Sequence, residues 1–189
     1  MQQVLAEKIF PNRSTLADLS LIILGSLLIA AFAQINIPLN PVPITGQTFA
    51  VLLVGMVLGS RRGALALVTY LAEGAAGLPV FAEMRSGVAT LLGPTGGYLF
   101  GFVAAAWLVG WLAERGFDRS LMKTLAAMAL GNAVIYLFGV LWLSRFVGSF
   151  AGEQGALALG MYPFLIGDTI KALLAALLLP SAWKLIGPS

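Results

Sequence analysis

Two ionisable residues stand inside a stretch of sequence that is otherwise apolar enough to span a membrane. The stretch is FLIGDTIKALLAALLLP, residues 164–180, and it contains Asp168 and Lys171. Residues three apart share a face of a helix, so a carboxylate and an ammonium would lie side by side. An ionised side chain at membrane depth costs about 2.5–3.5 kcal/mol, and pairing or a polar cavity lowers that cost. The two residues therefore form either a structural ion pair or part of a binding cavity.

Little other chemistry is open to this sequence. It contains no histidine and no cysteine, which removes the commonest general base, the commonest metal ligand and any thiol nucleophile. Only Glu73 adds a carboxylate at a similar depth, so neither a catalytic carboxylate pair nor a metal-holding cluster is expected. No Gly-x-x-x-x-Gly-Lys-Ser/Thr loop is present, so ATP hydrolysis by that route is excluded. We expect a binding protein rather than an enzyme, with no metal and no cofactor.

The composition places these residues in a polytopic membrane protein. Of 189 residues, 59% are apolar and only 10% are charged, and the mean hydropathy is +0.94. The apolar runs predict an all-α bundle of six transmembrane helices at residues 18–36, 46–60, 63–78, 94–113, 123–146 and 158–184. We expect residues 1–17 to form a cytoplasmic N-terminal segment and residues 18–189 to form a six-helix, substrate-binding transmembrane domain.

The distribution of basic residues predicts the orientation of this bundle. Eight of the eleven basic residues fall on one side of the expected membrane: Lys8, Arg13, Arg61, Arg62, Arg115, Arg119, Lys123 and Lys184. An excess of Lys and Arg marks cytoplasmic segments, so both termini should be cytoplasmic (N-in, C-in) in a multi-pass protein of the cell membrane. Orientation in the lipid bilayer also explains the net charge of +3 without any nucleic-acid partner.

Three segments on the opposite side are rich in proline and glycine and unusually apolar for loops. They are INIPLNPVPITGQTF (residues 35–49), GLPVFAEMRSGVATLLGPTGGYLFG (77–101) and SFAGEQGALALGMYP (149–163). Such segments are poor solvated linkers, and we expect them to be lids or walls of a pocket. A sixth span that begins near Pro163 places Asp168 one to two turns inside it, beneath these loops. This placement favours the binding-cavity interpretation of the charged pair.

Three segments, in this order, resemble one protein family. They are NPVPITGQTFAVLLVGMVLGSRRGALALVTYLAEGAAGLPVF, LLGPTGGYLFGF and GDTIKA. They look like the signature segments of BioY, the biotin-binding substrate-specificity (S) component of energy-coupling-factor (ECF) transporters, and the similarity runs from about Ala33 to Trp183. The resemblance implies a six-helix membrane protein that captures biotin from outside in a pocket closed by its first outer loop. It also implies a partner module of one transmembrane subunit and two ATPase subunits that drives uptake.

The resemblance carries site residues with it. Asp168 and Lys171 match the family's Gly-Asp-x-x-Lys motif, which is expected to hydrogen-bond the bicyclic head of biotin, and Gln47 and Tyr98 match positions near the pocket mouth. A ureido group suits the pair, since its two N–H groups can donate to a carboxylate and its carbonyl oxygen can accept from an ammonium. Arg85 stands where the family has a smaller residue, and it either reaches the ligand or its carboxylate tail, or faces the interface.

The first span supplies the expected docking surface. Ser26 and Ala30 correspond to the family's Ala-x-x-x-Ala patch, which docks on the partner membrane subunit, and serine keeps that patch small. Packing within the bundle is the alternative for these two residues. At the level of function, the nearest alternatives are an S component for a different vitamin and, in another class, a small membrane enzyme acting on lipid.

Overall fold

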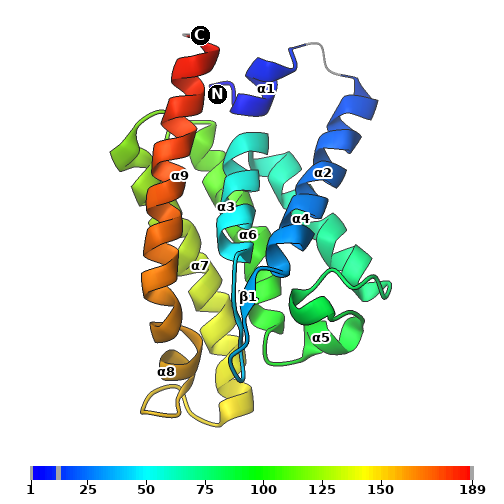
Figure 1. The fold of residues 1–189 in the computed structure, drawn as a ribbon, viewed down its shortest axis with the longest axis vertical. Coiled ribbons are helices and arrows are strands. Elements are labelled where there is room, and N and C mark those ends of the chain that lie inside the picture. Colours follow the sequence, from blue (N-terminus) through cyan, green and yellow to red (C-terminus); the bar gives the residue numbers. More distant parts are fainter. Residues whose placement is uncertain (1, 12–13, 188–189) are drawn as a thin grey trace.

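The computed structural model describes residues 2–11 and 14–187, and most of them are helical. Six longer helices form the bundle: α2 (Thr15–Ala33), α3 (Gln47–Leu58), α4 (Ser60–Ala75), α6 (Gly96–Ala113), α7 (Leu121–Val147) and α9 (Leu165–Ile186). Shorter elements connect them: α1 (Leu5–Ile9), β1 (Asn36–Ile37), β2 (Ile44–Thr45), the 3-10 turn η1 (Ala82–Met84), α5 (Val88–Leu92), α8 (Ala156–Gly160) and the 3-10 turn η2 (Tyr162–Phe164). Both chain ends lie at one end of the bundle, the terminal end; the β1–β2 hairpin, α5 and α8 lie at the opposite end, the pocket end (Figure 1).

Each expected span overlaps one of the six longer helices, with ends that shift by up to seven residues. Within the described ranges, four segments are long and apolar enough to cross a membrane: Thr15–Ala33, Gly96–Ala113, Leu121–Val147 and Ala156–Ile186. The helices α3 and α4 are shorter, with 12 and 16 residues. A helix of 12 residues rises only about 18 Å, less than the roughly 30 Å of a bilayer core. The hairpin lies beyond α3 at the pocket end, so α3 and the hairpin together extend along the bundle (Figure 1).

Glycines let the central helix α6 approach its neighbours closely. A Cβ atom on Gly97 would lie 2.2 Å from the Trp142 Cβ of α7, and one on Gly55 of α3 would lie 2.6 Å from the Ala106 carbonyl oxygen of α6. Such distances exclude any larger residue without backbone movement. In lipid, no hydrophobic effect drives helices together, so their association depends on close contacts of this kind. Gly97, in the fourth expected span, therefore serves packing, which fixes α6 and α7 around the pocket.

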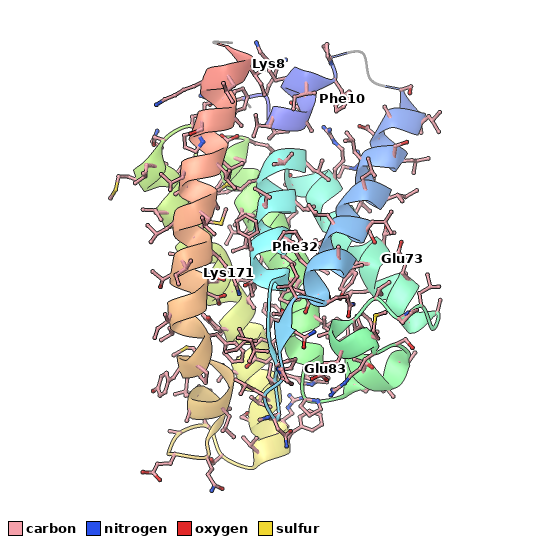
Figure 2. The ribbon with its side chains drawn as sticks, in the orientation of Figure 1. Lys8, Phe10, Phe32, Glu73, Glu83 and Lys171 are labelled. Atoms are coloured by element: carbon pink, nitrogen blue, oxygen red, sulfur yellow. The ribbon has the colours of Figure 1, made fainter. Side chains whose placement is uncertain are left out.

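The N-terminal segment packs against the bundle. Val4, which is the N-cap of α1, and Leu5 and Ala6 in its first turn are at most 3% exposed. All three belong to the main hydrophobic core. Glu7 pairs with Arg62 at the start of α4, with 2.8 Å between Oε1 and Nη2. The cytoplasmic location of this segment stays a prediction, and Arg13 lies outside the described residues. Lys8 projects at the terminal end, far along the bundle from Glu83 (Figure 2).

One half-buried acid and one fully buried acid stabilise the terminal end. Glu114, which follows α6, accepts hydrogen bonds from the Ser60 backbone N–H (2.8 Å) and hydroxyl (2.7 Å), and so caps the first turn of α4. Asp118, in the turn between α6 and α7, is fully buried and accepts a 2.6 Å hydrogen bond from the Trp183 indole. Burial raises the pKa of the Asp118 carboxyl, although the Trp183 hydrogen bond and the nearby Arg119 charge act in the opposite direction.

The pocket end is built from the first two proline- and glycine-rich segments. The strands β1 and β2 pair antiparallel, with Asn36 opposite Thr45, so the proline segment folds into a hairpin. Gln34, just after α2, clamps the loop that follows α4. Its side-chain N–H donates to the Phe81 carbonyl (3.0 Å), and its side-chain oxygen accepts from the Met84 N–H (3.2 Å). The clamp fixes this loop beside the hairpin.

Candidate functional site

A single pocket at the pocket end gathers all five side chains that the sequence indicated for substrate binding. It contains about 670 Å³ of empty space, part of it open to solvent. The hairpin contributes Val42 and Pro43, the loop after α4 contributes Phe81 and its neighbours, and α3, α6, α7 and α9 supply most of the remaining walls. The expected residues that line the pocket are Gln47, Arg85, Tyr98, Asp168 and Lys171. The expectation that loops 35–49 and 77–101 form pocket walls is therefore confirmed.

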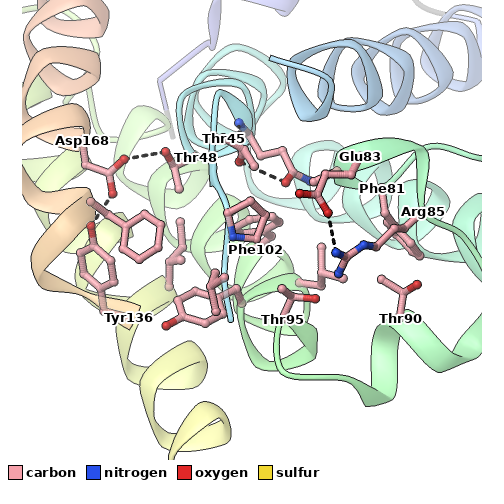
Figure 3. A pocket seen from close by; sticks show the side chains of 18 of the residues that line it. Thr45, Thr48, Phe81, Glu83, Arg85, Thr90, Thr95, Phe102, Tyr136 and Asp168 are labelled. Carbon is pink, nitrogen blue, oxygen red and sulfur yellow. Dashed lines mark hydrogen bonds and ion pairs between the residues drawn. The ribbon is translucent and has the colours of Figure 1, made fainter. Parts of the chain in front are cut away.

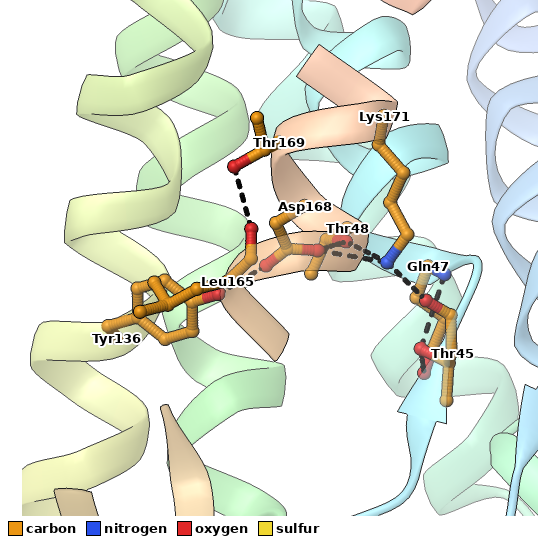
Figure 4. A network of polar contacts seen from close by, with 8 residues as sticks. All are labelled: Thr45, Gln47, Thr48, Tyr136, Leu165, Asp168, Thr169 and Lys171. Atoms are coloured by element: carbon orange, nitrogen blue, oxygen red, sulfur yellow. Dashed lines mark hydrogen bonds and ion pairs between the residues drawn. The ribbon is translucent and has the colours of Figure 1, made fainter. Parts of the chain in front are cut away.

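The Asp168–Lys171 ion pair lies at one side of this pocket. Lys171 Nζ is 2.9 Å from Asp168 Oδ1, and the side chains are 21% and 5% exposed. The ammonium also donates to the Thr45 carbonyl oxygen (2.7 Å) and to the Thr48 hydroxyl (2.9 Å), so all three of its protons are used (Figure 4). The pair is thus embedded in a network that joins α9 to the hairpin and to α3.

Asp168 lies nearer the helix start than the sequence indicated. Met161 adopts a non-helical conformation, and Pro163 lies in the turn η2, so α9 begins only at Leu165. Asp168 consequently falls in the first turn of α9 rather than one to two turns inside. The free N–H groups at a helix N-terminus favour a negative charge, which adds a local reason for a carboxylate at this position.

Two residues that the sequence analysis did not select complete the network. Thr48 of α3 donates its hydroxyl hydrogen to Asp168 Oδ1 at 2.8 Å, and Tyr136 of α7 donates its phenol hydrogen to Asp168 Oδ2 (Figures 3 and 4). Both also line the pocket. A threonine and a tyrosine in apolar helices carry no charge that would mark them. The only signal was indirect, since Thr48 directly follows Gln47 and precedes an apolar run.

Gln47 and Tyr98 line the pocket while their polar atoms are used within the protein. Gln47 is 4% exposed; its side-chain N–H donates to the Tyr70 hydroxyl (2.7 Å), and its side-chain oxygen accepts from the Thr45 hydroxyl (3.1 Å). The Tyr98 hydroxyl donates to the Gly160 carbonyl oxygen of α8 at 2.7 Å. In this arrangement Tyr98 offers the pocket mainly its ring, and Gln47 holds the hairpin against α4.

Arg85 lines the pocket on the side opposite Asp168 (Figure 3). Its guanidinium forms an ion pair with Glu83 at 2.5 Å, and the two side chains are 55% and 28% exposed. Glu83 and Met84 have φ values of 59° and 58°, in the left-handed region that residues with a Cβ rarely adopt. Glu83 carries no signal in the sequence, because its proximity to Arg85 depends on this unusual backbone.

Ser26 and Ala30, the small residues expected for partner docking, differ in their burial. Ser26 is fully buried and donates its hydroxyl hydrogen to the Glu73 carboxylate of α4, whereas Ala30 is half-buried. The exposed face of α2 carries larger apolar residues instead, among them Ile23, Leu24 and Leu27. A docking surface that includes Ser26 therefore requires α2 to separate from α4, and the docking role stays a prediction.

Among residues 2–11 and 14–187, no three acidic side chains come together in a way that could hold a metal ion. The helices, the apolar exterior and the enclosed polar network instead define a ligand-binding membrane protein. A comparison with protein families gives the family: the chain belongs to the BioY family, whose model matches residues 6–188.

Individual relatives agree with this assignment. The chain is 45% identical over 151 residues to the biotin transporter BioY of Thermotoga maritima, a match that covers 80% of this chain and 86% of the relative. It is 40% identical over 161 residues to the probable biotin transporter BioY of Pyrococcus horikoshii, covering 85% and 93%. Among solved structures, the S component for biotin from an ECF-type ABC transporter superposes with a TM-score of 0.78 at 26% identity, covering 92% of this chain and 94% of that one.

Proposed function

We propose that this chain captures biotin in the pocket described above and, with an energy-coupling module, mediates its uptake across the cell membrane. The observation that carries the proposal is the network centred on Asp168, a set of charged and hydroxyl groups at one side of a largely apolar pocket. Relatives named as biotin transporters, and a solved S component for biotin, support the choice of ligand.

The ureido group of biotin can enter this network by exchange of hydrogen bonds. The two carboxylate oxygens of Asp168 offer about four acceptor positions, and Thr48, Lys171 and Tyr136 occupy three of them. One ureido N–H can take the remaining position. Alternatively, that N–H can take the place of Tyr136 or Lys171, whose freed proton then reaches the adjacent ureido carbonyl oxygen. Each protein donor of the network keeps an acceptor in this exchange, which a dry pocket requires.

The remaining wall of the pocket suits the apolar part of such a ligand. Leu99, Phe102, Ile135 and Phe164 line it between the polar groups. We place the bicyclic head of biotin at Asp168 and Lys171, the thioether and aliphatic chain against these apolar side chains, and the carboxylate tail toward Arg85. Gln47 and Tyr98 act on the ligand chiefly by shaping the pocket mouth.

In this proposal the chain is a transporter subunit and not an enzyme, and it needs no cofactor. It crosses the membrane six times with both termini in the cytoplasm, and it works with one ECF transmembrane subunit and two ATPase subunits.

The helix α2 is the proposed docking element through Ser26 and Ala30. Ser26→Leu should abolish co-purification with the transmembrane subunit, because the leucine side chain both enlarges the patch and disturbs the contact with α4. Undiminished co-purification of Ser26→Leu and Ala30→Leu would contradict this docking role.

The experiment that tests the proposed ligand is a binding panel on the purified full-length chain. Biotin should bind tightly by calorimetry, while other vitamins added in excess should not displace it. Displacement of biotin by another vitamin at equal concentration would make this an S component of different specificity. An absence of biotin binding by well-folded protein would overturn the proposal.

A further inference from the structure

The ion pair of Glu83 and Arg85 gives the pocket a second polar end. Figure 3 shows it across the pocket from Asp168 and Tyr136, with Phe102 between the two sides. The two charged groups are 2.5 Å apart, and the side chains are 28% and 55% exposed. Because the pair lines the pocket and is only partly buried, the tail of a bound ligand can contact both of its charged groups.

The charges that line the pocket balance one another. The acids Asp168 and Glu83 face the bases Lys171 and Arg85, so the formal charge of the lining is zero. A ligand tail that ends in a lone carboxylate adds one negative charge and meets Glu83 wherever it meets Arg85. A tail that ends in both an ammonium and a carboxylate adds no net charge and offers each member of the pair a partner of opposite sign.

The backbone holds this pair in place. Glu83 and Met84 lie in the left-handed region, and strained residues of this kind cluster at binding sites. The Gln34 clamp fixes Met84, and a hydrogen bond of 3.1 Å from the Phe81 N–H to the Arg85 carbonyl oxygen closes the loop. The Glu83 carboxylate is therefore kept beside Arg85 at the pocket.

We propose that Glu83 and Arg85 form a subsite for the zwitterionic group of an α-amino acid carried on the tail of the ligand. The chain then binds biotin joined as an amide to the side-chain amine of lysine, in addition to free biotin. Glu83 accepts hydrogen bonds from the α-ammonium, and Arg85 donates to the α-carboxylate. This inference rests on the proposed function, since it needs the bicyclic head to be held at Asp168.

The test compares three ligands on the purified full-length protein by calorimetry: biotin, its lysine conjugate, and the same conjugate with an acetylated α-amine. The wild-type chain should prefer the free-amine conjugate over the acetylated one by about tenfold, the ratio that one charge-assisted hydrogen bond supplies. Glu83→Gln should remove this preference and should increase the affinity for free biotin, because the lone carboxylate of its tail no longer meets the Glu83 charge. Arg85→Gln should weaken both conjugates, because both keep the α-carboxylate.

Glu153→Gln is the matched control, because it neutralises an exposed glutamate in the loop before α8, outside the pocket. It should keep the tenfold preference. If the wild-type chain binds biotin but binds the two conjugates equally, the subsite is refuted and the biotin function stands. A preference that survives Glu83→Gln refutes the assignment to Glu83. If no ligand with the bicyclic head binds, both proposals fail together.

Discussion

Neutralising the Asp168–Lys171 pair one residue at a time and then together separates a structural role from a role in binding. Asp168→Asn leaves the Lys171 ammonium without its charged partner. Lys171→Met leaves the Asp168 carboxylate without its charged partner. Removing one member of a buried ion pair costs about 3–5 kcal/mol. The structure favours the lower end of this range, because Lys171 keeps the Thr45 carbonyl and Thr48 hydroxyl as acceptors, and Asp168 keeps the hydroxyls of Thr48 and Tyr136 as donors.

A loss of about 3 kcal/mol corresponds to a fall of roughly 6–12 °C in the unfolding temperature of a domain of this size. The double variant, Asp168→Asn with Lys171→Met, leaves no unpaired charge, so its unfolding temperature should return to within about 3 °C of the wild-type value. Its affinity for biotin should still be at least about a hundredfold weaker, since two charge-assisted hydrogen bonds to the ligand are gone. Thermal unfolding in detergent and calorimetric titration with biotin measure the two quantities on the same preparations.

Two results would refute this reasoning. A double variant that binds biotin with wild-type affinity makes the pair purely structural and removes the site assignment. A double variant that is no more stable than the single variants shows that the two charges do not compensate each other in the folded protein. Glu153→Gln again serves as the control for general effects of removing a charge, because Glu153 is exposed and remote from the pocket.

Three further substitutions test other parts of the structure. Tyr136→Phe should weaken biotin binding about fivefold in the same titration, because the phenol hydrogen that reaches the ureido carbonyl is lost; unchanged affinity would contradict the proposed exchange. Glu114→Ala should lower the free energy of unfolding by about 1–2 kcal/mol in denaturant titration, since it uncaps α4, whereas Glu153→Ala should not. Asp118→Asn tests the raised pKa. A raised folded-state pKa makes stability fall as pH rises above the unfolded value of about 3.9, so the unfolding temperature of the variant relative to wild type should increase from pH 4 upward. A pH-independent difference would contradict it.

The positions of the longer helices could be predicted because long apolar runs have few alternatives in a membrane protein. Their ends could not, because these depend on contacts between distant segments. The last span illustrates this: the apolar run from 158 to 184 reads as continuous, yet the backbone turns at Met161 and the regular helix begins at Leu165. Tyr98 bonds to the Gly160 carbonyl at this turn, and such a contact from another helix has no signature in the local sequence.

The burial of Ser26 has a similar origin. The sequence leaves two interpretations for this small residue, docking on a partner subunit and packing within the bundle, and it does not say which helix is contacted. In the structure the hydroxyl reaches Glu73, 47 positions away, and an acid within an apolar helix gains a hydrogen-bond donor by this contact. The preference of polar groups for a hydrogen-bond partner in an apolar environment therefore accounts for the positions of both Ser26 and Glu73.

The charged pair was visible in the sequence, and the groups that control it were not. Lys171 lies three positions from Asp168, whereas Thr48 is 120 positions away and Tyr136 is 32 away, so only folding brings these hydroxyls to the carboxylate. Each of these bonds joins α9 to another helix. A ligand N–H that replaces Tyr136 at Asp168 exchanges a bond between α7 and α9 for a bond to the ligand, and the freed phenol can restore the connection through the ureido carbonyl. Occupancy of the pocket is thereby coupled to the contact between these two helices, and Tyr136→Phe is the substitution that would break this coupling while the charged pair stays intact.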